Sequence, residues 1–388
     1  MTFSLDNAGR KSIQTYFTVS TLLFMVSFLL LPTAKMVNNV YYLLTALPAL
    51  LLIVFMRGRT LSITPSTLGW SLLLGWFVFV GALEGDLQFL KHVLYVALFL
   101  VVISQFVDPR FFNSPLFSRV LFWSVALYVL SSSVFYWLTG HYAFGERVLW
   151  LPARMTGPIY TSMWITSCFA LALPTWFSQR RFVELGIGLL IAIFLMGFAL
   201  QSRSGLAALV VLVAACSILL AVANKKAGLL TFALFVVGIG ILWFLTRDIP
   251  QIGQLLARGD ALRFEIWSTL ISEWNECGIW RGCGLAHQSQ HILTGGGGIL
   301  HPHNIFLALG VYTGLVSLLI FATLMCLALY QAWRQRNPWG LYLFASLVGL
   351  NFDGSMLIGN PDELWLLVLL PAALIIHRHN HPSGRQFS

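Results

Sequence analysis

The chain has 388 residues, of which 58% are hydrophobic and 10% charged, and its mean hydropathy is +0.81. Soluble domains carry about 25% charged residues, so this composition excludes a water-soluble globular protein. The net charge of +9 does not indicate a nucleic-acid partner, because Lys and Arg in membrane proteins gather in cytoplasmic loops and set the orientation. Apolar runs of about 18 or more residues recur along the whole length, and each is long enough to cross a bilayer. We therefore predict an all-α integral membrane protein.

Twelve membrane-spanning helices are predicted in chain order. Their approximate bounds are 15–31, 36–56, 66–83, 87–106, 117–138, 158–178, 182–200, 204–223, 227–246, 303–330, 338–357 and 363–377. The chain is thereby divided into residues 1–246 with the first nine spans, a large loop at 247–302, and residues 303–388 with the last three spans and a cytoplasmic tail.

The charge distribution predicts which side of the membrane the loops face. With an even number of spans and the N-terminus inside, the cytoplasmic side holds 14 of the 23 basic residues and only three acidic ones. These basic residues are Arg10, Lys11, Arg57, Arg59, Arg110, Arg119, Arg180, Arg181, Lys225, Lys226, Arg334, Arg336, Arg378 and Arg385. Since basic residues concentrate in cytoplasmic loops, the loop 247–302 is expected to face away from the cytoplasm.

Within this loop, "DALRFEIWSTLISEW" (Asp260–Trp274) has the pattern of an amphipathic helix. Its apolar residues stand at positions 262, 266, 267, 270, 271 and 274, and Asp260 is placed to cap the N-terminus. The tryptophan-rich face predicts that the helix lies against the membrane interface or the mouth of the bundle. Cys277 and Cys283 come later in the same loop and could form a disulfide in an oxidising compartment, which the sequence leaves open.

The segment "GGGGILHPHNIF" (Gly295–Phe306) gathers polar side chains at the start of a predicted span. Pro302 suits the first turn of a helix, where its missing N–H costs nothing. The helix N-terminus carries partial positive charge, which disfavours a charged imidazole. His303, supported by His301 and Asn304, is therefore expected to stay neutral near pH 7 and could act as a general base. The alternative is that these residues only cap the helix.

Metal binding is a second interpretation of the same region. His287 and His291 have i, i+4 spacing, His301 and His303 lie close behind them in the chain, and four imidazoles could ligate zinc. However, the Gly-rich linker between the two pairs fixes no geometry, and no Cys or carboxylate stands at a recognisable ligand spacing. We therefore expect no metal and no cofactor.

Arg203, in "ALQSRSGLAALVVL", joins two apolar runs through a very short connection. Its guanidinium must therefore lie at the membrane boundary or in the mouth of the bundle, since an arginine at the hydrocarbon centre costs about 2.5–3.5 kcal/mol on insertion scales. One interpretation is an interfacial arginine whose charge reaches water. The other is an anion site built from the guanidinium, the helix dipole and the hydroxyls of Ser202 and Ser204.

Arg263 and Asp353 are further charged residues at unusual positions. Arg263 stands in the first turn of the predicted loop helix, where a cation opposes the helix dipole. Either Asp260 or Glu265 compensates this charge, or the arginine is held there to meet an anion. Asp353, near the end of the span 338–357, could orient a histidine or an arginine, because buried acids in membrane bundles pair with a base.

Together these residues predict one site, on the side away from the cytoplasm, with a neutral histidine, two or more arginines and a carboxylate. Such a set suits a lipid-borne diphosphate and a hydroxyl nucleophile. The chain contains no D-x-D pair, so arginines would have to neutralise the leaving group. A transporter or flippase is the alternative from a different class, but it would place ionisable groups near the middle of the membrane rather than at one face.

"HNIFLALGVYTGLVSLL" (His303–Leu319), together with "LRFEIW" in the large loop and "QSRSG" at a helix start, resembles the O-antigen ligase family. This family belongs to a superfamily that also contains O-antigen polymerases and bacterial O-oligosaccharyltransferases, and these remain alternatives because they need the same base and the same charge clamp.

The resemblance implies an inverting, metal-independent glycosyltransferase in the inner membrane of a Gram-negative bacterium. It implies transfer of an undecaprenyl-diphosphate-linked O-antigen to lipid A–core on the periplasmic face. By the same resemblance, His303 would be the catalytic base, Arg203 and Arg263 would bind the diphosphate, and Asp353 would support them.

Overall fold

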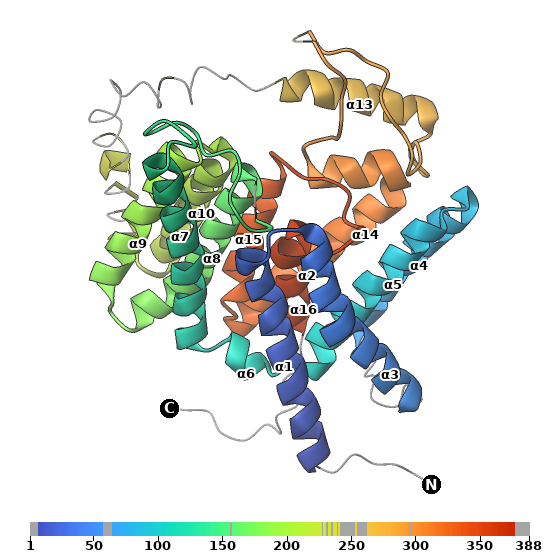
Figure 1. The fold of residues 1–388 in the computed structure, drawn as a ribbon, viewed down its shortest axis with the longest axis horizontal. Coiled ribbons are helices and arrows are strands. Elements are labelled where there is room, and N and C mark those ends of the chain that lie inside the picture. The colour runs from blue at the N-terminus through green and yellow to red at the C-terminus, as the bar shows by residue number, and fades with distance from the viewer. Residues whose placement is uncertain are drawn as a thin grey trace.

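The computed structural model describes residues 7–56, 64–155, 157–226, 262–294 and 296–376, with scattered positions between 228 and 253. This part of the chain is helical (Figure 1), and an isolated bridge between Ile292 and Gly298 is its only β pairing. Eight of its helices are long and apolar enough to cross a membrane. They are Ala8–Leu30, Ala34–Phe55, Pro65–Glu84, Leu87–Phe106, Pro115–Leu138, Phe182–Ala199, Arg203–Val222 and Ile305–Gln335.

The helices succeed one another in the order that the apolar runs predict. Their bounds are α1 Asn7–Leu30, α2 Ala34–Tyr41, α3 Leu47–Phe55, α4 Pro65–Glu84, α5 Leu87–Val101, α6 Pro109–Phe112, α7 Pro115–Leu138, α8 Pro158–Ser178, α9 Phe182–Phe194, α10 Arg203–Ala223, α13 Arg263–Cys277, α14 Ile305–Gln335, α15 Trp339–Leu350 and α16 Leu370–Ile376. A short π-helical turn at Tyr42–Ala46 joins α2 to α3, and similar turns at Val102–Phe106, Leu195–Ala199 and Trp365–Leu369 extend α5, α9 and α16.

Capping side chains next to a proline fix where several helices begin. The hydroxyl of Thr64 accepts the N–H of Thr67 at 3.1 Å before α4, and the hydroxyl of Ser114 accepts the N–H of Phe117 at 3.2 Å before α7. A proline comes directly after each cap, where its missing N–H is not needed. The spans predicted to start at residues 66 and 117 therefore begin within two residues of the expected positions.

The predicted span 158–178 is α8, which forms the centre of the bundle and packs against α7, α10 and α15. Hydroxyls on α8 reach its neighbours: Ser167 is 2.8 Å from Ser346 of α15, and Thr166 donates to the carbonyl of Gly205 in α10 at 3.1 Å. Small and hydroxyl-bearing residues let membrane helices approach closely and bond to one another. These polar residues lower the hydropathy of α8, which is not among the eight apolar helices.

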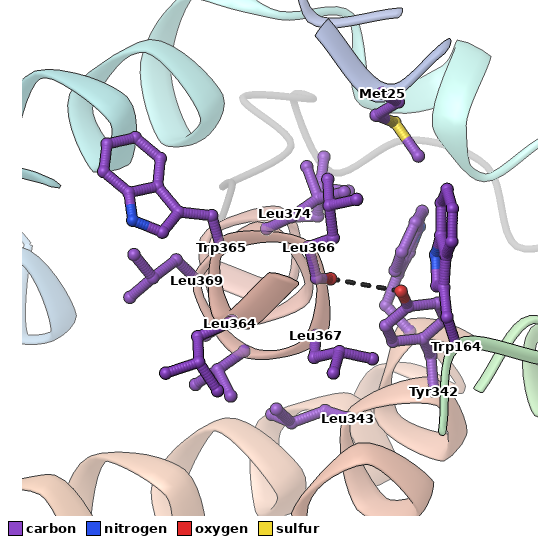
Figure 2. Close-up of a cluster of buried hydrophobic side chains, with 14 of the residues drawn as sticks. Met25, Trp164, Tyr342, Leu343, Leu364, Trp365, Leu366, Leu367, Leu369 and Leu374 are labelled. Carbon is purple, nitrogen blue, oxygen red and sulfur yellow. Dashed lines mark hydrogen bonds between the residues drawn. The ribbon is translucent and has the colours of Figure 1, made fainter. Parts of the chain in front are cut away.

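The C-terminal helix is enclosed by protein, with every residue from Trp365 to Ile376 buried. Figure 2 shows this helix with Trp164 and Tyr342 together on one side, where the Tyr342 hydroxyl donates to the carbonyl of Leu366 at 3.1 Å. The predicted span 363–377 is therefore a short helix in the core of the bundle.

The prediction that a span covers residues 338–357 is wrong at its end, because α15 stops at Leu350. The amide of Asn351 donates to Leu347 at 2.8 Å, and the chain then turns, with the N–H of Phe352 bonded to Gly349 at 2.9 Å. The connector, residues 351–364, then carries buried Leu357 and Ile358. The connector also holds Asn351, Asp353 and Asn360, so its composition is mixed and is not that of a membrane span.

The count of twelve spans is not confirmed, since the predicted span 227–246 lies largely outside the described residues. The same holds for most of residues 247–261 in the large loop, including Asp260.

Candidate active site

His303 lies directly before α14, in a backbone conformation that the neighbouring cap imposes. The side chain of Asn304 accepts the N–H groups of Phe306 and Leu307 at 2.9 and 3.1 Å, so Asn304 is the N-cap of α14. The chain reaches this cap with His303 at a φ of 51°, in the left-handed region that residues other than glycine rarely adopt. The cap that the sequence suggested therefore exists, and His303 lies directly before it.

His303 and Asp353 form a hydrogen-bonded pair. Nδ1 of His303 lies 2.7 Å from Oδ1 of Asp353, whose residue is only 5% exposed, whereas the imidazole is 32% exposed. A carboxylate only accepts hydrogen bonds, so the proton of the neutral imidazole lies on Nδ1 and the lone pair lies on Nε2. This arrangement orients a partly exposed histidine as a proton acceptor.

His301 supports this pair from the other side. Its ring centre lies 3.8 Å from that of His303, and its Nδ1 accepts the backbone N–H of His303 at 3.3 Å. Burial lowers the pKa of His301, and the neighbouring His303 lowers it further. His301 is therefore uncharged near pH 7 and holds the left-handed conformation of His303 without adding a competing cation.

The turn that carries Asp353 packs directly onto the start of α14. A Cβ atom on Gly354 would lie 2.4 Å from the backbone nitrogen of Ile305, a distance that leaves no room for a side chain. Asp353 and Gly354 therefore act together, because the glycine permits the close approach that brings the carboxylate to His303.

Arg203 is the first residue of α10, as predicted, and it lies at the same end of the bundle as Asp353. The start of α8 connects the two: Ser162 is 2.6 Å from Ser202, and Tyr160 is 3.5 Å from Ser355 in the connector. The starts of α8 and α10 and the connector that carries Asp353 thus meet at one end, which we call the His303 end.

The two serines beside Arg203 face the protein interior. Ser202 and Ser204 are both buried, and the Ser202 hydroxyl is engaged by Ser162. Their packing against α8 lets Gly205 approach Ser162 so closely that a Cβ atom there would lie 2.6 Å from it. The Ser202 hydroxyl thus helps to fix the start of α10, and an anion site at this helix would depend on the guanidinium and the helix dipole.

Arg263 begins α13, and its N-cap position is Leu262, two residues later than the cap predicted at Asp260. The residue before it, Leu262, has a left-handed φ of 61° and provides no side-chain cap. Glu265 accepts the N–H and hydroxyl of Thr294 at 2.9 and 2.7 Å, and His291 lies 3.2 Å away. These hydrogen bonds, chiefly those from Thr294, lower the pKa of Glu265 and bind it to the loop that precedes α14.

The loop helix α13 lies across the first turns of α14 (Figure 1). This position agrees with the prediction that the helix lies at the mouth of the bundle. Ile266 and Leu270 pack against Val311 of α14, and the indole of Trp267 donates to the carbonyl of Pro302 at 3.0 Å. The helix that starts with Arg263 is thereby attached to the segment that contains His301 and His303.

The four histidines of the zinc interpretation do not share one centre. His287 lies 2.8 Å from Glu273, and His291 lies 3.2 Å from Glu265, so each of the two loop histidines has its own carboxylate on α13. The ligand atoms of His301, His303 and Asp353 lie within 4.8 Å of one another, close enough for a metal ion. However, the short bond between His303 and Asp353 uses two of the atoms that an ion would need.

Near the site, one feature was not predicted from the sequence and another had been left open. Arg154, in the loop before α8, forms a two-pronged ion pair with Glu363, and one of its contacts, Nη2 to Oε2, is 3.1 Å. Cys277 and Cys283, whose pairing the sequence left open, are joined by a disulfide. In the sequence, Arg154 and Glu363 each stand close to a proline and on the side of the bundle that carries the other charged residues. This placement could have indicated the ion pair.

Two comparisons with known proteins find similar sequences. A family model described as O-antigen ligase matches residues 187–322, the stretch that contains Arg203, Arg263 and His303. The chain is also 26% identical, over 364 residues, to the O-antigen ligase of Pseudomonas aeruginosa (strain PAO1), and the match covers 87% of this chain and 84% of that protein. The motifs around His303 and Arg203, the apolar helices and both matches agree: the chain is similar to O-antigen ligases, and its helices are those of a multi-pass membrane protein.

Proposed function

We propose that this enzyme transfers an O-antigen polysaccharide from undecaprenyl diphosphate to a sugar hydroxyl of lipid A–core. The reaction takes place at the periplasmic face of the inner membrane, where the His303 end would lie according to the distribution of basic residues. The relative from P. aeruginosa is named an O-antigen ligase, which favours lipid A–core over a second lipid-linked repeat as the acceptor.

The observation that carries this proposal is the hydrogen bond between His303 and Asp353. His303 Nε2 takes the proton of the acceptor hydroxyl as its oxygen forms a bond to C1 of the donor sugar. Attack on the face opposite the leaving group inverts C1, and the bond from C1 to the diphosphate oxygen breaks. General-base catalysis of this kind contributes about 10²–10⁴-fold to a rate.

Arg203 and Arg263 would hold the diphosphate, whose negative charge grows as the C1–O bond breaks. Both begin helices at the His303 end, α10 and α13, and both residues are partly buried. Arginine binds phosphate oxygens with two parallel N–H donors, which suits a leaving group that no metal ion clamps. Removing one such donor costs about 10²–10³-fold in kcat for comparable charge-stabilising groups.

A cell that makes only the His303→Ala variant tests this proposal. We expect lipopolysaccharide without O-antigen, with the polymer retained on undecaprenol and the variant present in the membrane at normal amounts. His287→Ala is the matched control, because His287 is paired with Glu273 in the loop and should support normal lipopolysaccharide. Single capped repeats on lipid A–core in a strain lacking the protein would instead identify a polymerase, and normal lipopolysaccharide with His303→Ala would refute the role of the histidine.

A further inference from the structure

The long helix α14 is broken near its start, at Gly314. This glycine has φ 86° and ψ 174°, which is not a helical conformation. The break separates a short first piece, residues 305–313, from a long second piece, residues 315–335. His303 precedes the short piece, so the direction of the histidine depends on how that piece is held against the rest of the bundle.

The residues that hold it belong to a small loop closed by the disulfide between Cys277 and Cys283. We call residues 277–283 the disulfide ring. In an uninterrupted α-helix the N–H of Leu315 would donate to the carbonyl of Val311. Here that N–H donates to the carbonyl of Ile279 at 2.9 Å, and the Val311 carbonyl accepts the N–H of Cys283 at 2.6 Å.

The disulfide ring therefore supplies both the acceptor and the donor for one broken helical pair. Backbone groups left without partners at membrane depth are costly, so breaks in membrane helices persist where other parts of the protein satisfy them. A further carbonyl at the break, that of Thr313, accepts the indole N–H of Trp76 in α4 at 2.8 Å.

The fit between ring and break leaves no space for added atoms. A Cβ atom on Gly314 would lie 2.1 Å from the carbonyl oxygen of Trp280, and one on Gly282 would lie 2.6 Å from the carbonyl oxygen of Val311. Just after the ring, the N–H of Leu285 donates to Glu84 at the end of α4 at 2.9 Å. The ring is thus fixed between α13, α14 and α4.

We propose that the disulfide ring is a positioning element for catalysis: by inserting into the break at Gly314, it sets the direction of the short helical piece and so places His303 opposite its substrate. This inference rests on the proposed role of His303 as the base. The positioning residues are Gly314, Gly282 and the two cysteines of the disulfide, none of which is assigned contact with substrate.

Alanine substitutions at two ring glycines test the proposal on the full-length protein. Gly282→Ala places a Cβ atom against Val311, whereas Gly278→Ala adds a Cβ at a φ of 110° where nothing lies within 4 Å. Both substitutions strain the ring backbone, but only the first disturbs its contact with α14. In the transfer assay we expect Gly282→Ala to lower kcat about 10²-fold, which is the cost of misplacing a catalytic group by about 1 Å. The KM for the lipid-linked donor should stay within about threefold of the wild-type value. The acid limb of the pH profile of kcat should shift. Gly278→Ala should retain kcat within about threefold and the wild-type pH profile.

A loss of folded protein would lower the apparent kcat of both variants but leave the pH profile in place. The double variant Cys277→Ser/Cys283→Ser is a second test, and it is decisive if Gly282→Ala does not accumulate in the membrane. The kcat of the double variant should fall by a similar factor. Wild-type kcat and pH profile in the double variant, or equal losses in Gly282→Ala and Gly278→Ala, would overturn the positioning role. The His303→Ala variant distinguishes failure of the positioning role from failure of the proposed function. An active His303→Ala variant would refute the proposed function and, with it, the positioning role.

Discussion

Asp353 accepts a hydrogen bond from Nδ1 of His303 across 2.7 Å, although 50 positions separate the two residues in the chain. The pair joins the cap of α14 to the connector after α15. It gives a partly exposed imidazole a fixed orientation and a fixed tautomer, and the proposed mechanism depends on both.

Replacing the carboxylate should therefore disturb catalysis more than binding. In Asp353→Asn, the amide can donate to Nδ1 and thereby stabilise the tautomer with its proton on Nε2, which cannot act as a base. We expect kcat to fall by about 10²–10⁴-fold, the range seen when an orienting carboxylate is removed. Steady-state kinetics of the purified variant, with donor KM measured alongside, test this; an unchanged kcat would show that Asp353 does not orient the base.

The two arginines should contribute to stabilisation of the leaving group. Arg203→Ala and Arg263→Ala are each expected to lower kcat/KM for the lipid-linked donor by about 10²–10³-fold, and Arg203→Lys should restore only part of the loss, because an ammonium cannot bind phosphate through a planar fork. Arg334→Ala is the control, since this arginine lies in the last turn of α14, far along the helix from His303. If both alanine variants have the donor affinity and kcat of the wild type, Arg203 and Arg263 do not bind the diphosphate.

The ion pair between Arg154 and Glu363 should contribute to stability. Both side chains are mostly buried, with 20% and 11% of their surfaces exposed. Glu363→Gln removes the carboxylate that bonds the mostly buried guanidinium and should lower the free energy of unfolding by about 3–5 kcal/mol. Replacing both residues by Met should be less damaging, because no unpaired charge remains. Thermal unfolding in detergent compares the three proteins, and a Glu363→Gln variant as stable as the wild type would show that the pair contributes little.

His301 makes stability depend on pH in a defined direction. Its pKa is lowered in the folded protein, chiefly by burial, so the unfolded chain binds the proton more readily than the folded chain. The contribution of His301 is fully present above the unfolded pKa of about 6.5 and is lost as the pH falls toward the folded pKa.

A pair of melting curves tests this assignment. The melting temperature of the wild type should fall between pH 7.5 and pH 5.5, and the fall should be smaller in His301→Asn, whose amide oxygen can still accept the N–H of His303 but does not titrate. The same fall in both proteins would assign the pH dependence to other groups.

Local signals in the sequence predicted the parts of the site that local structure determines. The "HPHN" segment indicated a capped helix start with a histidine beside it, and Asn304 and His303 take those places. Likewise, the short connection around Arg203 predicted an arginine at a helix start, and the apolar runs predicted most spans to within a few residues.

The features that were missed depend on contacts between distant segments. The residues after Leu350 form a connector because Asn351 ends the helix and the protein buries Leu357 and Ile358. Similarly, an apolar run cannot reveal that α14 breaks at Gly314, since the break exists only because the disulfide ring and Trp76 provide partners for the freed backbone groups. The start of α13 was also placed too early, because the helix begins at Arg263, directly after a left-handed Leu262.

The most direct measurement is transfer of polysaccharide between purified lipid-linked donor and purified lipid A–core by the wild-type protein, His303→Ala and His287→Ala, with equal amounts of each protein in the same detergent. We predict transfer by the wild type and by His287→Ala, and a rate at least about 10²-fold lower with His303→Ala. Equal transfer by His303→Ala and the wild type, or no transfer by the wild type with an active donor and acceptor, would contradict a histidine-based ligase.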